Sequence, residues 1–366
     1  MTRANLFAIL ALALSFGTPA FAGSPDAMAW DVFARMTTPA SAAGAKAVAF
    51  ETWASDDDIY GKNPPHWPGR GSKMLSRSLA AMAEDVAAHR LSLPASDCQP
   101  KDGKAGNFPP GACIGEQVQH NRPVFDTIVT GDLYSTSGLI AAYAASKPID
   151  FPADSIVVKA DWVTIADLLR WLPHAYKTAA QVRRAYYTNV ATMNGHRGEY
   201  ALVGMSVQSK QRPQWLWMTF EHRSNPGRCD IIGCQDAFGA VFAKVPGRSA
   251  PNTDYGPCAK TTALKAVFAA HHIDPIWNNY CLKGTQTDFT AGGAPTVLAN
   301  SVIERMNKGV AVPDTSCITC HAYASFDGHG TPNYAVLPQH PTGAVNPALL
   351  AGYKTHDYLW SVLAAH

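Results

Sequence analysis

The chain has 366 residues, of which 47% are hydrophobic and 16% are charged, and its formal net charge is +2. This composition is typical of a globular protein and argues against intrinsic disorder, which requires low hydrophobicity and high net charge. The length is enough for two domains, or for one domain with a sizeable appendage. Charges of both signs are mixed along the chain without a long basic run, which argues against nucleic acid as a partner.

The first 22 residues have the pattern of a secretory signal peptide. Arg3 gives a positive start, residues 6–16 are apolar, and residues 20–22 form a small-x-small cleavage site with no cysteine after it, which argues against a lipoprotein. The alternative is an uncleaved membrane anchor, but the apolar stretch is short for a span and no later stretch is long enough. We therefore expect a periplasmic protein that begins near Gly23 and has no stable membrane span after cleavage.

Eight cysteines fit an oxidising compartment. Two belong to the motif described below, and the other six form three pairs that are close in sequence. Six cysteines allow fifteen connectivities, so nearest-neighbour pairing is one choice among several, and buried thiols are the alternative. The tightest of the three loops restrains its bridge geometry most. The expected disulfides are Cys98–Cys113, Cys229–Cys234 and Cys258–Cys281.

After the signal peptide, residues 23–125 are expected to form a mixed, irregular region. Helical periodicity is present at 26–35 and 73–89, and a short strand is expected at 47–53. Residues 126–295 are expected to form a β-rich body with disulfide-tied loops. β-branched and aromatic residues there predict strands at 155–162, 184–192, 200–208 and 214–222.

A short helix is predicted at 164–171, and Asn194-Gly195 is typical of the tight turn between two antiparallel strands. Residues 296–366 form the last segment, with helices predicted at 296–307 and 317–324. The predicted fold class is therefore α+β, an antiparallel β-sheet body followed by a C-terminal helical segment.

The chemistry-bearing motif is Cys317-Ile318-Thr319-Cys320-His321. Two thiols three positions apart lie on one side of a helical turn and can form thioethers with a haem, while the next imidazole ligates the iron. A redox dithiol would need a βαβ context, and a structural zinc site would need a second ligand pair. We therefore expect one covalent haem c, bound by Cys317 and Cys320, with His321 as the proximal ligand of the iron.

No methionine follows His321, so candidates for the distal side come from upstream. Strand alternation places His222 on the apolar face of its strand, and Met306 lies on the helix expected before the motif. Lys159 is a candidate for contact with the haem edge or a propionate, or for a cross-link. Each has a structural explanation as well: a buried hydrogen-bonded histidine, a core methionine and a lysine solvated at a strand edge.

We expect the haem to lie between the central sheet and the C-terminal helices. His222 is expected to be the non-motif histidine nearest the iron, with the aromatic residues at 358–360 covering the same pocket. Whether it acts as a distal ligand or as an acid/base group is left open by the sequence.

The chain resembles a group of poorly characterised proteobacterial periplasmic cytochrome c family proteins. The matching segments are residues 151–152, 155–162, 213–222, 300–301, the haem motif and 357–361. The order of segments is also similar to that of β-sheet cytochromes of the hydroxylamine-oxidising, lysine-cross-linked type and their nitric-oxide-binding relatives. These resemblances imply a lysine-bearing strand and an aromatic strand before a C-terminal haem.

Periplasmic electron transfer with a redox partner protein or small molecule is the leading functional expectation. One alternative is a haem enzyme or gas-binding protein acting on a small nitrogen oxide, hydroxylamine or peroxide. Another is a binding protein in which the haem is structural. Axial ligation of the iron distinguishes electron transfer from small-molecule chemistry. Two strong protein ligands favour electron transfer, and an iron with an open position favours small-molecule chemistry.

Overall fold

The structure is a computed structural model that describes residues 23–40, 47–61, 64–68, 74–75, 109, 111–193, 196–240, 253–303, 312–333, 336 and 342–366. The expected signal peptide, the expected helix at 73–89 apart from residues 74–75, Cys98 and Met306 lie outside these residues. Within the described part of the chain, every helix is too short or too polar to cross a bilayer.

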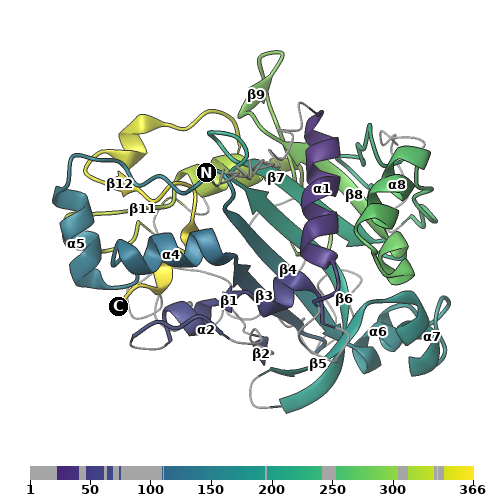
Figure 1. The fold of residues 1–366 in the computed structure, drawn as a ribbon. Helices are drawn as coiled ribbons and strands as arrows, with labels where there is room; N and C mark the ends of the chain where they lie inside the picture. The colour runs from purple at the N-terminus through teal and green to yellow at the C-terminus, as the bar shows by residue number, and fades with distance from the viewer. Residues whose placement is uncertain are drawn as a thin grey trace, which may run out of the picture.

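The chain forms an α+β fold around one large, mainly antiparallel sheet (Figure 1). Its described strands are β1 (Ala54–Ser55), β2 (Met74–Leu75), β3 (Ile114–His120), β4 (Ile156–Thr164), β5 (Thr188–Met193), β6 (His196–Ser209), β7 (Leu216–His222) and β8 (Tyr280–Gln286). One edge of β6 pairs with β4, while its other edge pairs first with β5 and then with β7. The order is therefore β1-β3-β4-β6, after which the sheet divides into β5-β2 and β7-β8.

Helices and two small hairpins surround this sheet. The described α-helices are α1 (Pro25–Thr37), α2 (Asp56–Ile59), α4 (Arg122–Thr130), α5 (Thr136–Ala144), α6 (Ile165–Trp171), α7 (Ala179–Ala185), α8 (Thr262–Ala270) and α10 (Cys317–Ala322). The described 3-10 helices are η1 (Ala49–Thr52), η2 (Pro275–Asn279), η3 (Val312–Asp314), η5 (Pro347–Leu350) and η6 (Trp360–Ala364). The hairpins are β9 (Thr290–Ala291) with β10 (Ala294–Pro295), and β11 (Ser325–Phe326) with β12 (Lys354–Thr355).

One face of the sheet is apolar and packs against α1 and α8, and we call it the α1 face (Figure 1). The hydroxyl of Ser24 accepts a hydrogen bond from the backbone of Ala27 and Pro25 follows, which is a typical helix start. The ring of Phe33 on α1 lies 4.5 Å from that of Phe220 on β7. Trp30 and Phe268 join the same aromatic cluster, which forms the main core.

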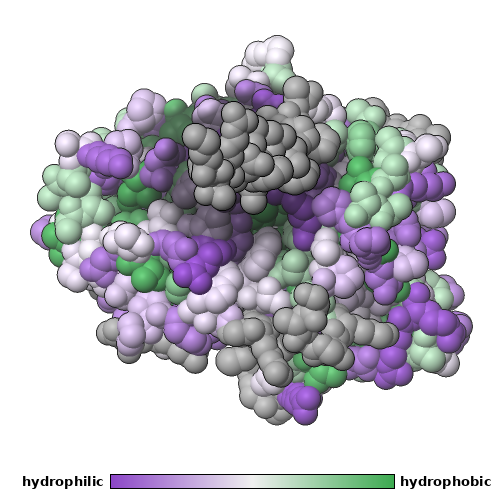
Figure 2. Space-filling model, viewed as in Figure 1, coloured by the Kyte–Doolittle hydropathy of each residue, from purple (hydrophilic) through white to green (hydrophobic). Residues whose placement is uncertain are grey.

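The other face, which we call the motif face, is polar in its middle. Apolar residues cover it at two ends, with α4 and the C-terminal segment at one end and α6 and α7 at the other. Figure 1 shows α4, α5, β11 and β12 gathered at the end opposite α6 and α7. Between these clusters the strands carry charged and hydroxyl side chains: Glu116, Lys159, Asp161, Thr219 and Glu221. Figure 2 shows that hydrophobic residues on the visible surface form small, separate patches.

The structure confirms most of the predicted elements of the central sheet. β4, β6 and β7 occupy the strands predicted at 155–162, 200–208 and 214–222, and α1 and α6 occupy two predicted helices. β5 and β6 pair antiparallel, with Met193 opposite His196, while the turn predicted at 194–195 lies outside the described residues. The sheet draws strands from both sides of residue 125, since β3 pairs along its whole length with β4.

Four expected elements differ from the structure. Residues 74–75, expected to begin a helix, form the strand β2. Residues 49–52 form the 3-10 helix η1 instead of a strand, because the Glu51 carboxylate turns back to accept from the backbone of Val48 at 3.1 Å. The strand predicted at 184–192 starts only at Thr188, because α7 continues to Ala185. Residues 296–300 are not helical, since the backbone of Leu298 bonds to Thr315 and forms a bridge to Ser316.

We expect replacement of Phe33 by alanine to lower the free energy of unfolding by about 3–5 kcal/mol, because it leaves a cavity in the aromatic core. Urea unfolding followed by tryptophan fluorescence measures this change. Ile140 on α5 is 43% exposed, so Ile140→Ala serves as the control and should change stability by less than about 0.5 kcal/mol. Equal effects of the two substitutions would contradict the assignment of this core.

Candidate functional site

Helix α10, which carries the pentapeptide 317–321, is fixed to the motif face by one buried amide. The hydroxyl of Ser316 caps the helix by accepting from the backbone of Thr319. Gln286 on β8 donates to the Ser316 hydroxyl at 2.8 Å, and its amide oxygen accepts from the backbone of Ile318 at 3.0 Å. Because both ends of one amide are used, the first turn of α10 has a defined position on the sheet.

The two thiols and the imidazole of the motif lie on this helix. Cys317 and Cys320 keep their thiols and are half-buried, and the Cys317 sulfur donates to the Leu298 carbonyl at 3.2 Å. The His321 ring packs 4.6 Å from the Trp217 ring on β7. The motif thus lies beside the first residues of β7, on the motif face.

His321 is oriented by a carbonyl from the end of the chain. Its Nδ1 lies 2.9 Å from the Tyr358 carbonyl oxygen, which can only accept a hydrogen bond. Nδ1 therefore carries the proton, and Nε2 keeps its lone pair. Burial lowers the pKa of His321 to about 4, and the charge of Lys159 also lowers it, so the imidazole stays neutral at pH 7.

The Tyr358 carbonyl is held in place by the neighbouring carboxylate of Asp357. This carboxylate accepts from the Lys210 ammonium at 2.7 Å, the Phe151 backbone at 2.8 Å and the Trp215 indole at 3.3 Å. Asp357 and Tyr358 both have positive φ, of 45° and 69°. Such backbone costs free energy and persists where surrounding contacts enforce it, and here those contacts direct a carbonyl at His321.

The residues present fit a haem c. Covalent attachment needs two thiols one helical turn apart, and ligation needs an imidazole nitrogen with a lone pair. A metal-ligating histidine almost always donates its other ring N–H to a carbonyl, carboxylate or water, as His321 does to Tyr358. Within the described residues, no group of three or more histidine, cysteine or acidic side chains is arranged to hold a metal ion.

The structure brings the predicted candidate Lys159 close to the motif. Lys159 lies on the motif face of β4, and its charge acts on both His321 and Asp56. It forms an ion pair with Glu116 on the neighbouring β3. A solvated lysine at a strand edge, the structural explanation favoured by the sequence, does not describe it, because β4 lies between β3 and β6.

His222 lies far along β7 from the motif. It is five residues beyond Trp217, which is about 16 Å at the usual rise of a strand. Its Nε2 donates to the Ala185 carbonyl at 3.0 Å, and its Nδ1 accepts from the Ser224 backbone at 3.2 Å. Both nitrogens are therefore used, which argues against the expected role near the iron and supports a buried, hydrogen-bonded histidine. Met306, the other distal candidate, lies outside the described residues.

The described residues confirm two of the predicted disulfides. Cys229–Cys234 and Cys258–Cys281 are bonded with Cα–Cα distances of 5.0 and 5.8 Å. Cys113 is also disulfide-bonded, while its predicted partner Cys98 lies outside the described residues.

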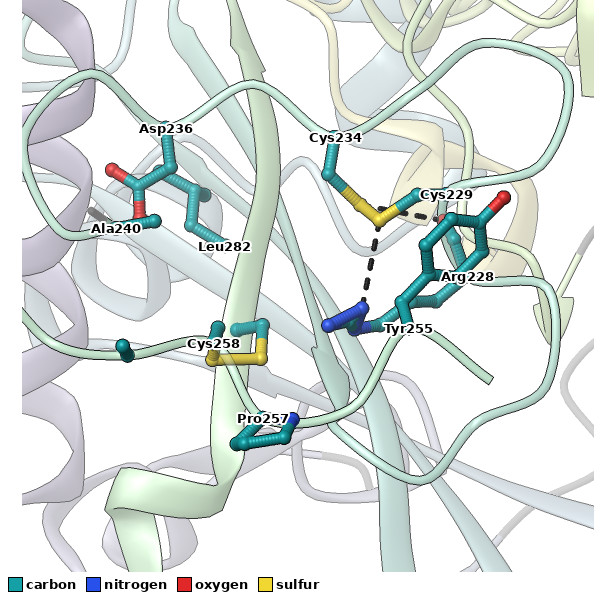
Figure 3. A pocket seen from close by; sticks show the side chains of 11 residues that line it. Arg228, Cys229, Cys234, Asp236, Ala240, Tyr255, Pro257, Cys258 and Leu282 are labelled. Atoms are coloured by element: carbon teal, nitrogen blue, oxygen red, sulfur yellow. Dashed lines mark hydrogen bonds between the residues drawn. A yellow bond between two sulfur atoms is a disulfide. The ribbon is translucent and has the colours of Figure 1, made fainter. Parts of the chain in front are cut away.

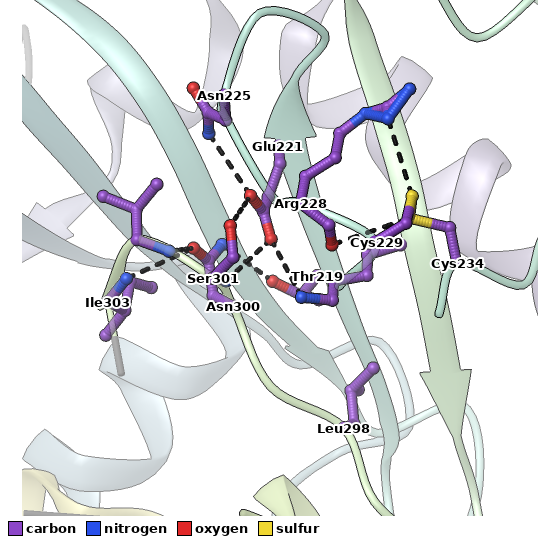
Figure 4. A network of polar contacts seen from close by, with 12 residues as sticks. Thr219, Glu221, Asn225, Arg228, Cys229, Cys234, Leu298, Asn300, Ser301 and Ile303 are labelled. Carbon is purple, nitrogen blue, oxygen red and sulfur yellow. Dashed lines mark hydrogen bonds and ion pairs between the residues drawn. A yellow bond between two sulfur atoms is a disulfide. The ribbon is translucent and has the colours of Figure 1, made fainter. Parts of the chain in front are cut away.

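A buried carboxylate missed by the sequence reasoning holds the chain that leads to the motif. Glu221 on β7 is fully buried and accepts from the Ser301 backbone at 2.7 Å and from the Ser301 hydroxyl (Figure 4). It also accepts from Asn225 and Lys283, each at 3.3 Å. Asn300 donates to the Thr219 hydroxyl at 3.0 Å. The available sequence signal was a lone carboxylate in an otherwise apolar and aromatic strand.

Ionisable groups continue across the motif face from Lys159 toward α2. The Nε2 of buried His120 lies 3.6 Å from Oδ1 of Asp56, and neither atom has a hydrogen-bond partner. Burial, followed by the charges of Glu116 and Asp57, raises the pKa of Asp56 to about 7, and burial lowers that of His120 to about 4. The Asp56 carboxyl can therefore hold or release a proton near neutral pH.

Comparison with known proteins gave no relative. No family model matches the chain, and no curated protein or solved structure matches it either.

His222 should make stability depend on pH. Burial lowers its pKa to about 3 in the folded protein from a usual 6.5, so the unfolded state binds more protons between these values. Stability therefore falls as the pH drops below 6.5, by up to about 1.4 kcal/mol per pH unit from this group. We expect His222→Gln to reduce that slope in urea unfolding between pH 6.5 and 4. Ser224→Ala, a neighbour without a titrating group, is the control, and an unchanged slope in His222→Gln would refute the assignment.

Replacing Glu221 by glutamine leaves the buried Lys283 ammonium without its counter-charge. We expect the free energy of unfolding to fall by about 3–5 kcal/mol. Glu199→Gln breaks the exposed pair with Arg183 and should cost only about 0–1 kcal/mol. Chemical unfolding of both variants measures the difference. A double variant, Glu221→Gln with Lys283→Met, should recover part of the loss, and failure of the single variant to exceed Glu199→Gln would contradict the role of this pair.

Proposed function

We propose that this chain is an exported c-type cytochrome with one covalent haem c, attached through Cys317 and Cys320 and ligated by His321. The observation that carries the proposal is the 2.9 Å contact between His321 Nδ1 and the Tyr358 carbonyl. It leaves Nε2 with its lone pair on the helical turn that also bears the two half-buried thiols. The signal-like first residues and the disulfides support export to the periplasm.

Electron transfer is the activity that these residues support best. A bound haem c supplies a one-electron redox couple, and the protein sets its ligation, burial and access. Tyr358 fixes the orientation of His321, and Trp217 packs against the imidazole. Because both cysteines are half-buried, the attachment point lies near the surface, where a periplasmic redox protein or small molecule can approach. A binding protein with a structural haem would need the same attachment but no such access.

A second function is favoured by the ionisable groups on the motif face. Reduction or oxidation of a small nitrogen oxide, hydroxylamine or peroxide moves protons as well as electrons. The Lys159–Glu116 ion pair and the Asp56–His120 contact lie on the same face as the motif. Of these groups, the Asp56 carboxyl, whose pKa burial raises to about 7, can hold such a proton. Carbon monoxide binding separates the two functions, because it requires an open coordination position on ferrous iron.

The test is expression of the chain together with a haem-attachment system. We expect the protein to keep one haem after acid–acetone extraction and to show a c-type spectrum in the reduced state. Cys317→Ala with Cys320→Ala should abolish this retention, because no thioether can form. Cys229→Ala with Cys234→Ala is the matched control and should keep the haem. A mature mass without haem in the unaltered chain, or haem retained by the Cys317/Cys320 variant, would overturn the proposal.

A further inference from the structure

In the Cys229–Cys234 disulfide one cysteine is partly exposed and the other is buried. The two cysteines are five positions apart. Cys234 is half-buried, whereas Cys229 is only 3% exposed. Both line a cavity together with Arg228, Tyr255 and the second disulfide, as Figure 3 shows. A thiol that approaches this site therefore reaches Cys234 first, and Cys229 is the sulfur that would leave.

A buried cation contacts the sulfur that would leave. The Nη1 of Arg228 lies 3.5 Å from the Cys229 sulfur, and Nη2 donates to the Gly256 carbonyl at 2.9 Å. Nε of the same side chain is buried and has no hydrogen-bond partner. A guanidinium in this position stabilises a thiolate by its charge and by hydrogen bonding, which speeds departure of that sulfur.

The loop closed by the disulfide also contains a strained residue. Ile231 has a φ of 68° and is 56% exposed. A β-branched side chain in the left-handed region is a true outlier, and such backbone persists only where its surroundings enforce it. Opening the disulfide removes the covalent restraint on this loop. Strained or exposed disulfides are the ones that exchange readily.

We propose that Cys229–Cys234 is a thiol–disulfide exchange site that accepts two electrons from a dithiol. One thiolate of the reductant attacks the Cys234 sulfur, the bond between the two cysteines breaks, and Cys229 leaves as a thiolate beside Arg228. The second thiol of the reductant loses its proton and attacks the mixed disulfide. Cys234 is released and protonated, and the reductant departs as its own disulfide. The protein gains two electrons and, once both sulfurs are protonated, two protons.

The Cys258–Cys281 disulfide is an internal reference with the opposite arrangement. Lys260 lies 2.9 Å from the sulfur of Cys258, which is the more accessible of the two. Attack there would expel Cys281, which is 3% exposed and is not hydrogen-bonded to any cation among the described residues. Lys260 therefore contacts the sulfur that would be attacked and not the sulfur that would leave. We expect the Cys258–Cys281 disulfide to be structural.

The experiment treats the full, folded chain with dithiothreitol, traps thiols by alkylation at increasing times and identifies each cysteine by mass spectrometry. We expect Cys229–Cys234 to open at least about tenfold faster than Cys258–Cys281. Arg228→Gln should slow its opening about threefold, because a change of roughly one pKa unit in the leaving thiolate affects the exchange rate at about half its size. Arg223→Gln removes the same charge nearby without a sulfur contact and should leave the rate unchanged.

A second pair of variants keeps the test valid if Arg228→Gln fails to fold. Glycine adopts positive φ without strain, so Ile231→Gly should shift the reduction equilibrium about fivefold toward the disulfide. Ile232→Gly, in the same loop but without positive φ, should not produce this shift. Equal opening rates for the two disulfides, or identical equilibria for the two glycine variants, would overturn the proposal.

Discussion

A carboxylate buried in a β-sheet has to be paired, because an ion without partners costs several kcal/mol away from water. Glu221 meets this requirement through Ser301, Asn225 and Lys283, which come from three separate parts of the chain. None of these segments can leave β7 without taking a partner away from the buried charge. The approach to the Cys317–His321 motif is therefore fixed to the sheet by charge and hydrogen bonding as well as by the apolar packing of Leu298 and Val302.

The two faces of the sheet carry different kinds of side chain. The α1 face holds a close-packed aromatic cluster around Phe33 and Phe220, which gives the sheet its rigidity. The motif face carries Lys159 and Glu221 together with the thiols and imidazole of α10. Polar and ionisable groups that would be costly in the main core are thus kept on the motif face, where Lys159 pairs with Glu116 and Glu221 pairs with Lys283. A cofactor site on this face gains a rigid support without disturbing the core.

Local patterns in the sequence predicted the elements that depend on local preferences. Alternation identified β7, and the spacing of Cys317, Cys320 and His321 identified a helical turn that the structure confirms as α10. The same alternation gave no information on which face and which end of β7 meet the motif. The sequence therefore favoured His222, whereas the structure places Trp217 against His321. Residues 296–300 have helical spacing, but the hydrogen bonds of Asn300 and Ser301 to the sheet outweigh that weak preference. Partners distant in sequence decided each of these outcomes. The sequence placed residues 358–360 beside the pocket as aromatic cover, but it gave no sign that the Tyr358 carbonyl would be the partner of His321.

The carbonyl that orients His321 lies 37 residues further along the chain. During synthesis, residues 317–321 are made well before Asp357 and Tyr358. In that interval the His321 imidazole has no carbonyl to fix its tautomer. The ring becomes oriented once Asp357 pairs with Lys210, because that pair holds the neighbouring Tyr358 carbonyl in place. The geometry of the motif therefore becomes final only after residues 357–358 have been made.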